Sequence, residues 1–238
     1  MTNWIQKTAV FLPFLLLAAI TACDTTNDNA NQPVMSLSAT STTGTQPKAP
    51  SSIQSGHVTI TAAKFLLKEI EFSSDLNDDG LPDDSLDFET DMVVVNLSLD
   101  GTLNEIIVKE IPPRRYDEVE FEIHKPEDFE TPPDPDFKEG TSGDQRFSVI
   151  IEGTFNQQSF TYKSRVNMSQ EHEFATPLLV EEGQEVNVTL LVDISQWFVD
   201  ANGNDLDPTD PNNASEIDES IERSVELFED NDEDGVED

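Results

Sequence analysis

Two acidic loops carry the clearest chemical pattern in the sequence. In each, oxygen-bearing side chains alternate with other residues before a glycine, which is Gly80 in the first loop and Gly235 in the second. Oxygens at this spacing converge on a hard cation, and the glycine permits the sharp turn of a calcium loop. The sequence therefore predicts calcium ligands at Asp75, Asn77, Asp79 and Asp83 and again at Asp230, Asp232, Asp234 and Asp238.

The first loop resembles the calcium loops of EF-hands, dockerins and thrombospondin type 3 repeats. Leu86 stands where an EF-hand has a bidentate glutamate, so Asp87 or Glu89 would have to take that place. One alternative stays open for each loop: a solvated acidic turn for the first and a disordered acidic tail for the second. A weaker cluster of aspartates and asparagines at residues 200–207 is more typical of Asx turns than of a third site.

The sequence contains no motif that is typical of catalysis. His57, His124 and His172 share no metal-ligand spacing, and neither a Gly-x-Ser-x-Gly elbow nor a phosphate-binding loop occurs. We therefore expect a protein that is not an enzyme. The alternative is a carbohydrate-binding protein or a carbohydrate-active enzyme, because glycosidases need only two carboxylates. Trp197 and Phe198 are the candidate sugar platform, and the hydrophobic core is the competing assignment for this pair.

The start of the chain predicts a bacterial signal peptide at residues 1–22. Lys7 precedes an apolar run at residues 9–20, which is shorter than the roughly 18–20 residues that span a hydrocarbon core. The segment from Ile20 to Cys23 resembles the lipobox of bacterial lipoproteins, and Cys23 is the one cysteine of the chain. The resemblance implies cleavage before Cys23 and acyl chains on that residue, which would hold the protein to a membrane of the cell envelope.

Residues 23–52 are predicted to be the lipidated cysteine and a disordered tether. They are rich in Ser, Thr, Asn and Pro, and few of them are suited to a hydrophobic core. Asp24 resembles an inner-membrane retention signal of enteric bacteria. That rule varies between lineages, so the membrane and its leaflet stay open.

The formal net charge of −36 excludes one class of partner. Nucleic acids need a basic surface, so nucleic-acid binding is not expected. Anionic lipid headgroups are repelled as well, which leaves the acyl chains on Cys23 as the predicted membrane contact. A second origin of the acidity is also open, since proteins of salt-loving organisms carry excess acid for solubility.

Alternation of apolar and polar residues predicts an all-β fold, an antiparallel β-sandwich of about eight strands at residues 53–199. Prolines make residues 126–143 a long loop rather than a central strand. Residues 200–238 are predicted to be an acidic segment with a short helix at about 215–229 and a terminal aspartate-rich loop. The helix is predicted because Ile217, Ile221, Val225 and Phe228 recur at helical spacing.

A longer stretch resembles a family of bacterial lipoprotein domains of unknown function. The resemblance rests on the run from Val58 through Asn96-Leu97 and Ile111-Pro112 to Tyr116, and on the alternating segment 119–123 that follows. It covers roughly residues 55–194 and implies a transthyretin-like sandwich, with no activity to carry over. The chain differs from the family where Pro113-Arg114 replaces an alanine-glycine pair and Asn96 replaces an aspartate.

These features together predict a lipid-anchored protein of the cell envelope. We expect it to act as a calcium-stiffened binding or structural module. Its partner would be a protein or a glycan, and no motif distinguishes the two.

Overall fold

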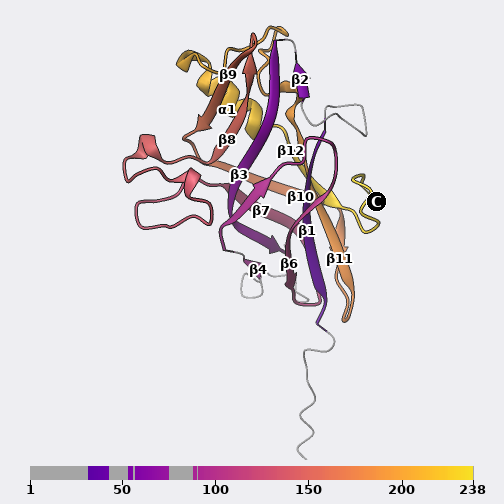
Figure 1. Cartoon of the computed structure of the whole chain (residues 1–238). Coiled ribbons are helices and arrows are strands. Elements are labelled where there is room, and N and C mark those ends of the chain that lie inside the picture. The colour runs from indigo at the N-terminus through magenta and orange to yellow at the C-terminus, as the bar shows by residue number, and fades with distance from the viewer. Residues whose placement is uncertain (1–31, 43–52, 56, 75–87, 90, 238) are drawn as a thin grey trace, which may run out of the picture.

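The computed structural model describes residues 32–42, 53–55, 57–74, 88–89 and 91–237 (Figure 1). Within these ranges the chain forms two β-sheets and one short α-helix, α1 (Ala214–Glu222). The predicted mostly β fold with a short C-terminal helix is confirmed.

The first sheet has four strands in the order β12-β11-β1-β6. They are β1 (Val34–Thr42), β6 (Asn104–Glu110), β11 (Glu185–Asp193) and β12 (Val225–Glu229). β1 runs parallel to β11 over its whole length and antiparallel to β6. The sheet is therefore mixed, and the prediction of a purely antiparallel sandwich is wrong at the β1–β11 pair.

Strand β1 lies inside the segment that was expected to be a disordered tether, so that prediction is wrong for residues 34–42. Met35, Leu37 and Ala39 alternate with hydroxyl-bearing residues and are at most 1% exposed. On the other face of the strand, the Ser36 hydroxyl donates a hydrogen bond to the Asn187 side chain of β11. The strand was not predicted because serine and threonine dominate the composition here and conceal the alternation of apolar and polar residues. The strands that pair with β1 also lie far along the chain.

The second sheet has the strand order β10-β7-β3-β8-β9, and three short strands also pair with β3. Its strands are β2 (Ile53–Ser55), β3 (Val58–Ser73), β4 (Phe88–Glu89), β5 (Val93–Asn96), β7 (Arg115–Ile123), β8 (Val149–Phe155), β9 (Gln158–Ser164) and β10 (Met168–Leu179). β3 is the long bulged strand that the sequence predicts. Its register shifts between Ile60 and Ala62 and again between Lys68 and Glu71, where Glu69 has a φ of 56°.

Apolar side chains from the two sheets share one core, and a smaller cluster covers the outer face of the second sheet. Leu66 and Ile150 point to that outer face, where they pack with Phe137 and Phe147. Both phenylalanines belong to the long segment that joins β7 to β8, which contains the short 3-10 turns η3 (Pro135–Phe137) and η4 (Gly143–Gln145). The predicted long loop is thus confirmed, and it forms the lobe that projects to the left in Figure 1.

The C-terminal helix is shorter than predicted. α1 ends at Glu222, and residues 225–229 form β12, which pairs antiparallel with β11. Ile217 and Ile221 pack into the core from the helix, whereas Val225 and Phe228 are buried from the strand. Hydrogen bonds to the open edge of β11 make a strand more stable here than the helix that the spacing predicts. Because β1 and β12 both belong to the first sheet, the sandwich extends beyond the predicted bounds 53–199.

Candidate functional site

The C-terminal aspartate loop is closed around one buried carboxylate. Asp230 follows β12 directly, and its side chain is fully buried. Its Oδ2 accepts hydrogen bonds from the Thr189 hydroxyl at 2.8 Å and from the Gly235 amide at 3.0 Å, and its Oδ1 accepts one from the Asp234 amide at 3.0 Å. The loop is therefore fixed both to β11 and to itself.

This closure brings three predicted calcium ligands together. One carboxylate oxygen from each of Asp230, Asp232 and Asp234 lies within 4.8 Å of the other two. Oxygens at that separation can share one cation, because calcium takes its ligands at about 2.3–2.6 Å. Gly235 has a φ of 80°, a left-handed conformation that a sharp turn requires and that glycine adopts without strain. The loop can hold a hard divalent cation at the surface end of β12.

The other predicted site residues are in different situations. Asp75, Asn77, Asp79 and Asp83 of the first loop, Asp238 and Cys23 lie outside the described residues. The aspartate cluster at residues 200–207 forms Asx turns, as the sequence favoured. Asp200 Oδ1 accepts hydrogen bonds from the Asn202 and Asn204 amides at 2.8 and 2.7 Å. Hydrogen bonds from the Asn204 side chain and amide lower the pKa of Asp200 to about 2.

Trp197 and Phe198 belong to the core, so the prediction of a sugar platform at this pair is wrong. They are 0% and 2% exposed. The Trp197 ring lies 5.8 Å from that of Phe65, and its Nε1 donates to the Ser224 hydroxyl at 2.8 Å. Stacking on a sugar needs an exposed ring face, which neither residue offers. The pair lies shortly after β11, and that position in the sequence is compatible both with an exposed sugar platform and with the hydrophobic core.

A polar groove of about 560 Å³ lies beside α1, and its lining bears on the carbohydrate alternative. Gln196, Asn212, Glu216 and Arg223 are among the side chains that line it. None of the described residues that line this groove is aromatic. The groove therefore offers hydrogen-bonding groups to a ligand but no stacking surface.

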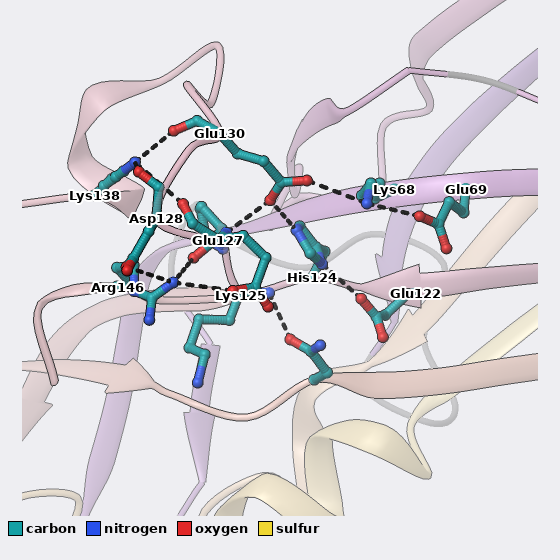
Figure 2. A network of polar contacts seen from close by, with 12 residues as sticks. Lys68, Glu69, Glu122, His124, Lys125, Glu127, Asp128, Glu130, Lys138 and Arg146 are labelled. Atoms are coloured by element: carbon teal, nitrogen blue, oxygen red, sulfur yellow. Dashed lines mark hydrogen bonds and ion pairs between the residues drawn. The ribbon is translucent and has the colours of Figure 1, made fainter. Parts of the chain in front are cut away.

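The three histidines lie in three separate environments. The exposed His57 ring contacts Asp205 at 2.7 Å, whereas the His172 ring stacks on Phe121 with 5.8 Å between ring centroids. Burial lowers the pKa of His172. His124 is buried, and its neighbours form the polar network of Figure 2.

His124 lies between two glutamates. Its Nδ1 is 2.5 Å from Glu122 Oε1, and its Nε2 is 2.6 Å from Glu130 Oε2 (Figure 2). Lys68 of β3 contacts the second oxygen of Glu130 at 3.1 Å. Burial alone would raise the pKa of Glu130, but the Glu127 amide, His124 and Lys68 all stabilise its charge and lower the pKa to about 2. The network is largely buried at His124 and Glu130, and both carboxylate oxygens of Glu130 have partners.

The network joins the β7–β8 lobe to the sheet beneath it. Lys68 and His124 come from the sheet or its end, and Glu130 comes from the lobe. Sequence reasoning missed this network. Glu122 and His124 are two residues apart at the end of a strand and so face the same side, which was the one local signal available. The pairing with Lys68 and Glu130 depends on how the lobe folds back.

The outer face of the second sheet is rich in glutamate. Glu71, Glu120 and Glu171 occupy directly opposed positions on β3, β7 and β10. A hollow of about 280 Å³ lies beside them, and Glu118 brings a carboxylate oxygen within 4.8 Å of those of Glu120 and Glu171. Like charges directly opposite one another are destabilising, and a cation near these carboxylates would offset their repulsion.

Within the described residues, no helix is both long and apolar enough to cross a membrane. No family model matches the sequence, and no curated protein and no solved structure matches it. The resemblance to bacterial lipoprotein domains therefore stays a prediction from residues 55–194.

Proposed function

We propose that this chain is a lipid-anchored, non-enzymatic module of the cell envelope that binds a partner and is stiffened by calcium. The observation that carries the calcium part is the aspartate loop closed around buried Asp230. The transthyretin-like fold belongs to the same proposal. In its support, the Tyr116 hydroxyl donates to the Pro112 carbonyl at 3.0 Å, which closes the turn on which the family resemblance rests.

Calcium has a structural role in this proposal because the loop is attached to the core. Asp230 accepts a hydrogen bond from Thr189 of β11, and it directly follows the end of β12 at Glu229. A cation held by Asp230, Asp232 and Asp234 would offset their mutual repulsion and fix the end of β12 against β11. The ion would therefore stabilise the first sheet rather than take part in a reaction.

Calcium is expected to raise the thermal midpoint of the full chain at low salt. At a concentration about 100 times the dissociation constant, the gain is about 2.7 kcal/mol, or about 5–10 °C for a chain of this size. The measurement is a melting curve by circular dichroism with calcium and then with chelator. Midpoints within about one degree of each other would contradict the proposal.

Two variants of the loop separate ligand loss from charge loss. Asp232→Asn removes one ligand, so part of the calcium-dependent shift should disappear. Glu233→Gln removes the same charge from the neighbouring position, which lies outside the ligand spacing and should leave the shift unchanged. Equal shifts in both variants would mean that the loop does not bind the ion.

The lipid anchor would be attached to Cys23, and the position of β1 limits how far the sandwich can lie from it. Ten residues, 24–33, separate Cys23 from Val34, and a chain of that length spans at most about 35 Å. The greatest distance between the sandwich and the lipid surface would therefore be smaller than with a tether that ended at residue 52. The net charge repels anionic lipid, so the acyl chains would provide the attachment.

The Cys23→Ser variant is expected to leave the membrane fraction of a bacterial host, because it cannot carry the acyl chains that provide stable binding. The measurement is immunoblotting of membrane and soluble fractions after a high-salt wash. The unchanged chain serves as the control and should stay with the membrane. A serine variant that also stays there after the wash would overturn the anchor.

A further inference from the structure

One aromatic side chain in the β7–β8 lobe is almost fully exposed. Phe129 is 85% exposed, whereas Phe137 and Phe147 of the same lobe are 0% and 2% exposed. Phe129 lies at the third position of a turn that Glu127 and Glu130 close, with a hydrogen bond from the Glu130 amide to the Glu127 carbonyl at 3.2 Å. The other two phenylalanines thus pack on the sheet with Leu66 and Ile150, and Phe129 is outside this apolar cluster.

The turn that carries Phe129 is fixed by hydrogen bonds from Lys138. The Lys138 ammonium donates to the carbonyls of Glu127, Asp128 and Glu130 at 3.1, 2.8 and 2.5 Å (Figure 2). These three residues flank Phe129 on both sides. All three donors of the ammonium are used, so the turn is pinned on both sides of the exposed ring.

Further bonds connect the same turn to the network around His124. The Glu130 carboxylate accepts from the Glu127 amide at 2.7 Å and contacts His124 and Lys68. On the other side, the Arg146 guanidinium donates to the Pro126 carbonyl at 2.8 Å, and its side chain is only 11% exposed. The backbone that presents Phe129 is therefore held by charged groups that are themselves largely buried. A rigid presentation lowers the ordering entropy that a binding partner would otherwise have to overcome.

The surroundings of Phe129 define the partner that would fit. Glu127 and Asp128 precede it, and their side chains are 51% and 68% exposed. The chain as a whole carries a net charge of −36. Anionic lipid and a second copy of this chain are both repelled, whereas a cationic surface is attracted. An apolar stripe flanked by Lys and Arg would receive the ring and meet both carboxylates.

We propose that Phe129 is the anchor of a docking surface for a basic amphipathic helix of a partner protein. The helix buries the ring between apolar side chains on successive turns, and its basic flank meets Glu127 and Asp128. This surface is separate from the aspartate loop, and the inference goes beyond the proposed calcium role. A negative result for calcium leaves it unaffected, and the reverse also holds.

The test is a titration of the full chain with a synthetic five-turn helix of about 18 residues, built from Leu on one face and Lys on the other. Charge alone will attract this peptide to an acidic protein, so the test compares the dissociation constants of the variants with that of the unchanged chain. Phe129→Ala should weaken binding by about tenfold at about 0.15 M salt, where charge attraction is screened. Leu179→Ala, which removes another exposed apolar side chain, should change binding by less than about twofold.

A second variant tests the rigid presentation. Lys138→Met leaves Phe129 in place but removes the bonds that hold its turn, so it should also weaken peptide binding while circular dichroism shows that the sheets remain. Equal peptide binding by the unchanged chain and by Phe129→Ala would overturn the proposal. Phe129-dependent binding to neutral phosphatidylcholine vesicles would overturn it too, because the ring would then be a membrane contact. Running the titration with calcium and with chelator keeps the two proposals distinct.

Discussion

The Trp197→Ala variant is expected to lose about 3–5 kcal/mol of its free energy of unfolding. Trp197 is fully buried and lies directly after η5 (Ile194–Gln196), which follows β11. Its ring contacts Phe65 of the second sheet, and its Nε1 donates to Ser224, which lies between α1 and β12. The side chain therefore links both sheets and the C-terminal segment. Its removal leaves a cavity among elements that cannot all collapse into it.

Urea unfolding followed by circular dichroism measures this loss. The Trp197→Phe variant is the matched control, because it keeps most of the apolar volume and removes the bond to Ser224 with a small part of the ring volume. Its loss should be about 1–2 kcal/mol. A loss below about 1 kcal/mol for the alanine variant would mean that the ring does not join the sheets.

The Glu130→Ala variant is expected to lose about 3 kcal/mol of its free energy of unfolding, since it removes one partner from a largely buried charged network. His124 and Lys68 each lose a carboxylate contact, and the Glu127 amide loses its acceptor. Those groups are buried or partly buried and cannot all be hydrated in exchange. The measurement is again urea unfolding. In addition, the turn that carries Phe129 should become susceptible to limited proteolysis while the sheets stay protected.

The Glu139→Ala variant is the control for this experiment. Glu139 of the same lobe pairs with Lys163 of β9, and the Glu139 side chain is 54% exposed. Exposed pairs contribute about 0–1 kcal/mol, so this variant should unfold almost as the unchanged chain does. If both glutamate variants lost the same amount, the buried network would have no special role in stability.

The contribution of Glu130 also depends on pH, in a direction that its pKa fixes. The network lowers the pKa of Glu130 from the ordinary value of 4.5 to about 2 in the folded chain. Its stabilising effect is therefore complete above pH 4.5 and disappears as the pH falls towards 2. The difference in unfolding free energy between the unchanged chain and Glu130→Gln should be largest at neutral pH and should shrink below pH 4.5. A constant difference would contradict the low pKa.

The sequence by itself determined the elements whose stabilising interactions are local or periodic. Alternation predicted β3, β7, β8, β9 and β11, because a strand with one buried face must alternate. The prolines at residues 132–135 predicted that the segment between β7 and β8 would be a loop. The spacing of the terminal aspartates predicted that their carboxylates would gather, because a loop that turns at Gly235 brings alternate side chains to one side. Cys23 and residues 75–83 lie outside the described residues, so lipid attachment and the first calcium loop stay predictions.

Only the tertiary structure decided the features that depend on residues far apart in the chain. The Ser- and Thr-rich composition of β1 is typical of a polar tether. The segment forms a strand because it pairs with β11 and β6, and its own composition does not reveal that pairing. Val225 to Glu229 had helical spacing, but the open edge of β11 made a strand more stable there. The sequence did not distinguish between a surface and a core position for Trp197, and the packing of both sheets around it places it in the core. His124, Glu130 and Lys138 carry no sequence motif, since their geometry exists only after the lobe folds back onto the sheet.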